Sequence, residues 1–167
     1  MRKLILMVLM AVATTATAQQ LDLKVLDKIA SKAKKTTEMG LDAATLKSTT
    51  DLLNTKKGDE AAAKKSTEDM KGFFLRSYEF EKGDFKFDDL KPITDQLKAP
   101  NWTRFLRNKE DREQTEIWMH LTDGKPDGML LISMEDEELT VINAIGYSNV
   151  ADFAKLKDLG APTAKKD

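Results

Sequence analysis

The chain has 167 residues, a length typical of one domain with a sizeable core, and its 27 basic and 28 acidic residues give a net charge of −1. This balance argues against a nucleic-acid-binding protein, which usually carries a clear basic excess. The chain has no cysteine and one histidine, so thiol nucleophiles, thiolate metal sites and sites that need two imidazoles are excluded.

Residues 1–18 have the pattern of a secretory signal peptide. Two basic residues precede a continuous apolar run from Leu4 to Val12, and Ala16-Thr17-Ala18 is a small-x-small cleavage signal. The apolar run is shorter than the roughly 20 residues that a membrane-spanning helix needs. No cysteine stands near the cleavage site to carry a lipid. We therefore expect export to the periplasm or the medium, cleavage after Ala18, and no stable membrane anchor.

The next part of the chain is rich in helix-forming residues. Apolar residues recur at three- and four-residue steps from Asp22 to Lys35, which predicts an amphipathic helix. Residues 36–41 are expected to be a short extended segment. Asp42 is expected to cap a second helix that places Leu46 and Leu53 on one face.

After a break at residues 57–59, residues 60–70 predict a weaker, mostly polar helix. The aromatic and β-branched residues then concentrate between residues 71 and 147. Phe74, Tyr78 and Phe80 alternate with polar residues, which is strand spacing. Beyond them, Asp88 is expected to cap a short helix with three core residues, Leu90, Ile93 and Leu97, that ends at Pro100.

Three or four more strands are expected to follow, joined by short polar turns, and then a final helix that is capped by Ser148 or Asn149 and reaches Leu159. Sequential strands with short links predict an antiparallel meander. We therefore expect an α+β domain over residues 19–160, followed by a frayed tail at 161–167. It should have two layers: an antiparallel sheet of four to five strands, and helices packed on one of its faces. The strands are expected at residues 102–108, 114–121, 129–134 and 139–145, with turns at 109–112, 123–128 and 135–138.

The strand over residues 115–121 carries the one histidine. Ile117, Met119 and Leu121 would face the core, and Glu116, Trp118 and His120 would lie on the more open face. His120 could then serve as a general base beside Glu116, or as a lone metal ligand. The alternative is a surface histidine on a half-exposed strand. No motif supplies a nucleophile or further ligands, so the sequence predicts no catalytic residue.

Aromatic and arginine side chains on neighbouring strands form a candidate binding patch, because these residue types anchor many binding surfaces. In the alternative interpretation the aromatic side chains belong to the core and Arg76 extends to the sheet edge. The acidic runs at 123–127 and 135–138 lack the spacing of a calcium loop, and the sequence predicts no metal or cofactor. The candidate binding residues are Arg76, Tyr78, Trp102, Arg104, Trp118 and His120.

Several runs, taken in order, resemble the DUF4252 family of exported bacterial proteins of unknown function. The resemblance covers nearly the whole predicted domain and implies a place in the bacterial cell envelope, but it supplies no catalytic residues. Many members look like lipoproteins, and this chain departs from them because it lacks the lipid-bearing cysteine. The runs are Leu21 to Ala33, Gly72 to Phe80, Leu97 to Arg104, Glu138 to Asn143 and Leu156 to Gly160.

Three hypotheses of function follow. The first is a non-enzymatic binding or regulatory protein of the envelope, with an envelope or periplasmic protein as its partner. The second is an envelope hydrolase that uses His120 and Glu116 as acid–base groups. The third is a carrier of a small apolar ligand, held between helices and sheet.

Overall fold

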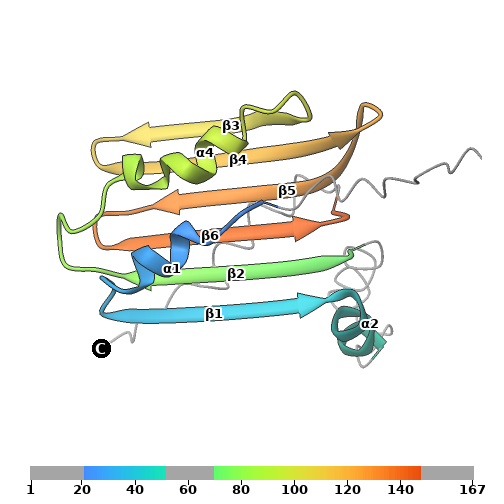
Figure 1. The fold of residues 1–167 in the computed structure, drawn as a ribbon, viewed down its shortest axis with the longest axis horizontal. Helices are drawn as coiled ribbons and strands as arrows, with labels where there is room; N and C mark the ends of the chain where they lie inside the picture. Colours follow the sequence, from blue (N-terminus) through green and yellow to red (C-terminus); the bar gives the residue numbers. More distant parts are fainter. Residues whose placement is uncertain (1–20, 52–69, 148–167) are drawn as a thin grey trace, which may run out of the picture.

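The computed structural model describes residues 21–51 and 70–147. In this part of the chain six strands form one antiparallel sheet in the order β1-β2-β6-β5-β4-β3 (Figure 1). The sheet has six strands rather than the expected four to five. The additional strand is β1, because residues 36–41, which were expected to be a short extended segment, pair with β2. The strands are β1 (Lys35–Asp42), β2 (Gly72–Glu79), β3 (Trp102–Glu110), β4 (Glu113–Thr122), β5 (Lys125–Met134) and β6 (Glu138–Ile145).

The order of the strands follows from one long crossover. After β2 the chain runs through a 3₁₀ turn, η1 (Phe87–Leu90), and the short helix α4 (Lys91–Gln96), which carry it across the sheet to the far edge (Figure 1). Strands β3 to β6 then return as an antiparallel meander, as the sequence predicts. The last strand, β6, pairs with β2 and so joins the meander to the β1–β2 pair.

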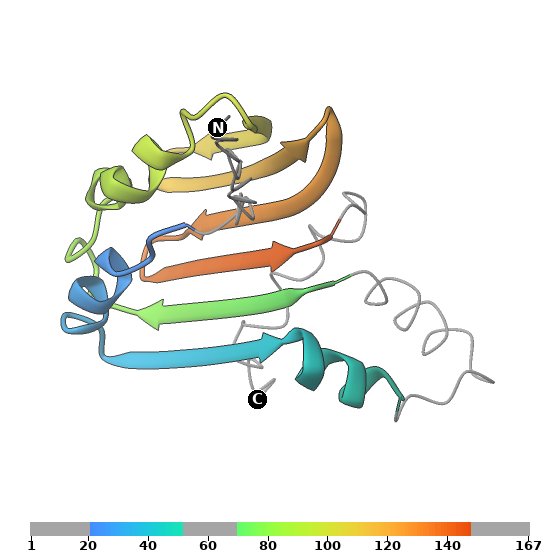
Figure 2. The same ribbon diagram turned by 45° about the vertical axis from the view of Figure 1, so that its right-hand side comes forward.

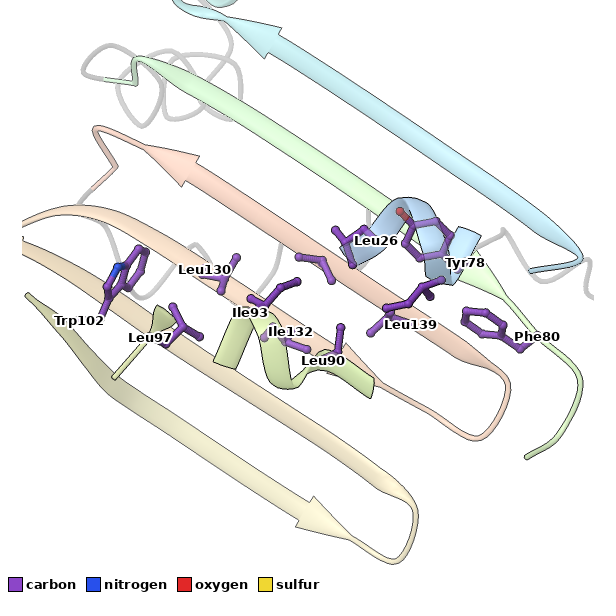
Figure 3. Packing of buried hydrophobic residues seen from close by; sticks show 12 residues of the cluster. Leu26, Tyr78, Phe80, Leu90, Ile93, Leu97, Trp102, Leu130, Ile132 and Leu139 are labelled. Carbon is purple, nitrogen blue, oxygen red and sulfur yellow. The ribbon is translucent and has the colours of Figure 1, made fainter. Parts of the chain in front are cut away.

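Helices α1 (Val25–Ala30) and α4 lie across the same face of the sheet, here called the helix face (Figures 1 and 2). Their apolar side chains interdigitate with those of β2, β5 and β6 (Figure 3). Burying each of these large side chains contributes about 1.5–3 kcal/mol, which makes this layer a main source of stability. The core of this face contains Leu26, Ile29, Tyr78, Phe80, Leu90, Ile93, Leu97, Trp102, Leu130, Ile132, Leu139 and Val141.

The other side of the sheet, here called the opposite face, carries a second apolar cluster that includes Leu75, Leu131 and Ile142. Helix α2 (Ala43–Asp51) contributes Leu46 to this cluster, so the expectation that all helices pack on one face is wrong. Next to the apolar rows, a row of hydroxyl and amide side chains crosses the opposite face in register from strand to strand. The row is Thr37, Ser77, Thr140, Ser133, Thr115 and Asn108.

Local signals explain where two of the helices begin. Asp42 caps α2 as predicted: its Oδ1 accepts the backbone N–H of Thr45 at 2.8 Å. At the start of η1 the backbone N–H of Lys86 donates to the carboxylate of Asp89 at 3.0 Å, so the capping carboxylate is Asp89, within the turn, rather than the predicted Asp88. The first helix is shorter than predicted and ends at Ala30, since the Lys34 amide already pairs with Glu79 across the sheet.

The turns of the meander are tighter than the sequence predicts. Asp123 and Gly124 have φ angles of 51° and 74°, the left-handed values of a two-residue type I′ hairpin turn. Strand β5 therefore begins at Lys125, and the residues up to Gly128, predicted as loop, belong to it. The next hairpin turn is likewise short, so β6 begins at Glu138.

Several predictions fall outside the described residues: the signal peptide and its cleavage, Leu53, most of the polar helix at 60–70, the final helix and the tail. Met70 is described and is buried in the second cluster. Among residues 21–51 and 70–147, no helix has the length and apolar character needed to cross a membrane.

Candidate functional site

Strand β4 presents four polar or amphipathic side chains on the helix face. Its register with β3 and β5 places Gln114, Glu116, Trp118 and His120 in one line along the strand. The sequence pattern predicts an open face for the last three. In the structure they lie on the covered face, because this face is the one that α4 crosses, and the exposed fractions of Glu116 and His120 are only 3% and 0%. His120 is therefore not a surface residue.

The buried carboxylate of Glu116 is held by two donors from its own strand. The Gln114 side-chain amide donates to Glu116 Oε1 at 2.9 Å, and the Trp118 indole donates to Oε2 at 2.8 Å. All three residues share one face because of the two-residue repeat of the strand. Buried polar groups are stable in a fold when they are hydrogen-bonded, and both carboxylate oxygens of Glu116 accept a hydrogen bond here.

Two arginines of the edge strand β3 complete this arrangement, here called the Glu116 cluster (Glu116, Gln114, Trp118, Arg104 and Arg107). Arg107 Nε lies 3.3 Å and Arg104 Nη1 3.6 Å from Glu116 Oε1. The guanidinium of Arg104 also lies over the Trp118 ring, 5.4 Å from its centre. Both arginine side chains remain more than two-fifths exposed, at 43% and 45%, so they can contact a molecule from solvent.

A β-bulge explains why these two arginines share a face. Residues three apart on a regular strand point to opposite sides of the sheet. The register between β3 and β4 shifts between Arg104 and Leu106, so that Arg104 pairs with Trp118 and Arg107 with Glu116. The extra residue restores the alternation, and both guanidinium groups reach the helix face.

The Glu116 cluster forms part of the floor of an open cleft of about 730 Å³ between α4 and the strands β3 to β5. Charges of both signs line it. The β3 wall carries three cations, Arg104, Arg107 and Lys109, whereas the carboxylates of Asp88, Asp111, Glu135 and Asp136 lie on η1 and on the turns at the ends of the strands.

On the α4 wall two lysines share one carboxylate, which offsets their charge only in part. Lys91 and Lys98 both donate to Asp95, at 2.7 and 2.6 Å, and these bonds lower the pKa of that carboxyl. The two lysines are thereby engaged with α4's own carboxylate. The cleft can therefore accept an anionic group along β3.

His120 belongs to a different arrangement, here called the His120 network (His120, Asn101, Asp127 and Thr122). Its Nδ1 contacts Asp127 Oδ1, its Nε2 contacts the Asn101 side-chain amide, and Thr122 donates to the other Asp127 oxygen at 2.6 Å. Burial raises the pKa of Asp127, but the bonds from Thr122 and His120 outweigh it, and the pKa is lowered overall. Both ring nitrogens of His120 are thus engaged within the fold.

The Trp102 ring lies edge-on against His120, with 5.1 Å between ring centres. These residues tie the start of β3 to the β4–β5 hairpin. His120 and Glu116 stand four residues apart on one strand, about 13 Å by strand geometry, and each has its own hydrogen-bond partners described above. The structure does not bring them together as an acid–base pair, and His120 does not line the cleft of the Glu116 cluster.

Arg76 and Tyr78 form a third, separate group on β2. Arg76 contacts Asp27 of α1 at 3.1 Å and Glu38 of β1 at 3.6 Å, and so ties the first helix and the first strand to the sheet. Tyr78 is fully buried beneath α1, and this burial raises the pKa of its hydroxyl. Three strand spacings, about 14 Å, separate this group from Trp118.

The six predicted binding residues therefore divide into three pairs: Arg104 with Trp118, Trp102 with His120, and Arg76 with Tyr78. Sequence reasoning missed Arg107 and Gln114 as members of the Glu116 cluster. The two-residue repeat of β4 predicts that Gln114 lies on the same face as Glu116. Arg107 could not be predicted in the same way, because only the bulge in β3 brings it to the helix face. Within residues 21–51 and 70–147, no three histidine or carboxylate side chains gather as a metal site.

Comparison with known proteins identifies the domain. No curated protein sequence matches the chain. The model of one family, described as a domain of unknown function, matches residues 28–156, which is more than half of the chain and includes every strand of the sheet. The chain belongs to the DUF4252 family.

Proposed function

We propose that the protein is an exported, non-enzymatic binding protein of the bacterial cell envelope, and that it holds an acidic protein partner in the cleft above Glu116. The observation that carries the proposal is the Glu116 cluster, in which a buried carboxylate fixes two half-exposed guanidinium groups beside an indole ring. Arginine and tryptophan are the residue types that most often dominate binding energy at protein interfaces.

The role of Glu116 in this proposal is to orient the arginines before the partner arrives. A free arginine side chain loses rotamer entropy when it is fixed on binding, about 1–2 kcal/mol. Because Glu116 and the Trp118 ring already hold Arg104, part of this cost is met on folding. Each guanidinium keeps exposed N–H donors, and a carboxylate from the partner would receive charge-assisted hydrogen bonds from them.

The same geometry favours binding over the hydrolase hypothesis. An acid–base pair needs both groups within reach of one substrate. His120 has both ring nitrogens engaged, and its network is separate from Glu116. For a carrier of an apolar ligand, the cleft is unfavourable because charged side chains line its β3 and α4 walls.

Binding can be measured with a short synthetic peptide of alternating glutamate and valine, using tryptophan fluorescence, against a matched peptide of lysine and valine. Arg104→Ala and Arg107→Ala should each weaken binding of the glutamate peptide about tenfold, the loss of one charge-assisted contact. Lys125→Ala removes an exposed cation outside the cleft and should leave affinity within about twofold. Equal binding of the two peptides, or equal loss in all three variants, would refute the proposal.

Location is tested separately. Cell fractionation should recover the protein in the periplasm or the medium, cleaved after Ala18, and deletion of residues 2–18 should retain it in the cytoplasm. Full-length protein in the cytoplasmic fraction of normal cells would contradict the export part of the proposal, whatever the result with the peptides.

A further inference from the structure

We propose that the outer edge of β3 accepts an extended acidic segment of the partner protein as a seventh strand of the sheet. The inference rests on the proposed function and names how the acidic partner is held. Addition of a strand to a sheet edge is a general mode of peptide recognition, in which backbone hydrogen bonds give affinity and alternate side chains give specificity.

The edge of β3 is long and open. In the described part of the chain β3 pairs with β4 alone, and every residue from Thr103 to Glu110 is exposed. The bulge presents two large apolar side chains there, Phe105 with 54% and Leu106 with 39% of its surface exposed. A partner strand would cover these side chains as well as the unpaired backbone.

The backbone groups available to a partner can be identified from the register. The Leu121 amide donates to the Asn101 carbonyl at 2.8 Å, so the next residue pair, Trp102 with His120, is a non-hydrogen-bonded pair. Hydrogen-bonded and non-hydrogen-bonded pairs alternate in an antiparallel ladder. Arg104, Arg107 and Lys109 therefore direct their N–H and C=O groups away from β4, toward the open edge.

The side chains of the same three residues give this edge its charge. Strand β3 carries three cations, Arg104, Arg107 and Lys109, against one anion, Glu110. A partner strand with acidic side chains on the helix-face side would pair with them across the ladder, where opposite charges are stabilising. The other edge strand, β1, carries one cation and two anions and lacks this complementarity.

A second copy of the chain is a poor occupant of the same edge. Antiparallel pairing of two β3 strands would place all three cations of one copy next to those of the other on one face of the joined sheet. Like charges on adjacent strands are destabilising, and cationic edges are a common means of preventing such association. The charge therefore selects an acidic segment from another protein.

The decisive experiment is hydrogen exchange of the wild-type protein, read by NMR, with and without the glutamate–valine peptide. The amides of Arg104, Arg107 and Lys109 should exchange at least about tenfold more slowly when the peptide is bound, because each acquires or shares a hydrogen-bonded strand partner. The Asn108 amide, which points toward β4, serves as the internal control and should change much less. Peptide binding without protection of the three outward amides overturns the inference but leaves the proposed function standing.

Two further measurements separate backbone pairing from side-chain contacts. The same peptide N-methylated at two consecutive central residues keeps its charges but cannot pair along either edge, and it should bind at least about tenfold more weakly. Arg107→Pro should bind more weakly than Arg107→Ala, since both lose the guanidinium but only proline loses the outward N–H. Equal affinities of the methylated and unmethylated peptides would overturn the inference.

The same experiments also test whether a second copy of the chain, rather than an acidic partner, occupies the edge of β3. Concentration-dependent protection of the outward amides without any peptide would show that a second copy occupies the edge, and would overturn the assignment to an acidic partner. Failure of the glutamate peptide to bind at all overturns both the inference and the proposed function.

Discussion

Replacing Glu116 by methionine should destabilise the fold by about 2–4 kcal/mol. The substitution keeps an unbranched side chain of similar length, so it leaves no large cavity. It removes the acceptor of two donors, the buried Gln114 amide and the half-buried Trp118 indole. Hydrogen bonds to a charged acceptor contribute about 1.5–3 kcal/mol each, and the added apolar burial offsets about 1–2 kcal/mol.

The arginines contribute little to this loss. Arg104 and Arg107 are half-exposed and can turn to solvent once the carboxylate is gone. Glu116→Gln should therefore cost only about 1 kcal/mol, because the amide keeps one acceptor for Trp118 and the Gln114 side chain can rotate to accept from the new amide. Exposed Glu113 on the same strand is the matched control, and Glu113→Met should stay within about 0.5 kcal/mol of wild type.

Urea unfolding followed by far-ultraviolet circular dichroism gives these free energies without relying on the tryptophan whose contacts change. The expected order of destabilisation is Glu116→Met, then Glu116→Gln, then Glu113→Met. The reasoning is refuted if Glu116→Met lies within about 0.5 kcal/mol of wild type. It is also refuted if glutamine costs as much as methionine, since charge rather than acceptor capacity would then stabilise the site.

Three other substitutions test the rest of the fold. Asp127→Asn should lower the free energy of unfolding near neutral pH and make it fall less steeply on acidification. The native pKa of Asp127 is below 3.8, so the stability that its carboxylate contributes is present above about pH 4 and is lost as the pH falls through the native pKa. Unfolding of the variant and of wild type, measured across acidic pH, tests this. Ile142→Ala in the fully buried second cluster should cost about 2–5 kcal/mol in urea unfolding, and a loss under 1 kcal/mol would mean that the opposite face is not tightly packed. Asp42→Ala removes the cap of α2 and should cost about 1 kcal/mol, whereas Asp42→Ser should restore most of it.

Much of the fold was predictable because local rules decide it. The alternation of Phe74, Tyr78 and Phe80 identified β2, and the spacing of Leu90, Ile93 and Leu97 identified the buried side of the crossover. Asp42 marked the start of α2 because an aspartate side chain satisfies the first free amides of a helix. These signals depend only on residues near one another in the chain.

The candidate site depended on contacts that local rules do not contain. The two-residue repeat places Glu116, Trp118 and His120 on one face, and their polarity favours an open face. That face is covered instead, because the crossover packs on it. The partners of His120 are Asn101, which precedes β3, and Asp127, in β5 beyond the hairpin turn. Neither could be assigned without the strand register.

By itself, the sequence predicts export, excludes cysteine chemistry and predicts an antiparallel meander with short helices, since composition and periodicity are properties of the chain alone. Tertiary structure decided that β2 pairs with β6, that the polar face of β4 is buried, and that a bulge brings Arg104 and Arg107 onto Glu116. The physical reason is that burial and register belong to pairs of elements: a strand's two faces are equivalent until something packs on one of them, and a bulge exists only relative to the strand it pairs with.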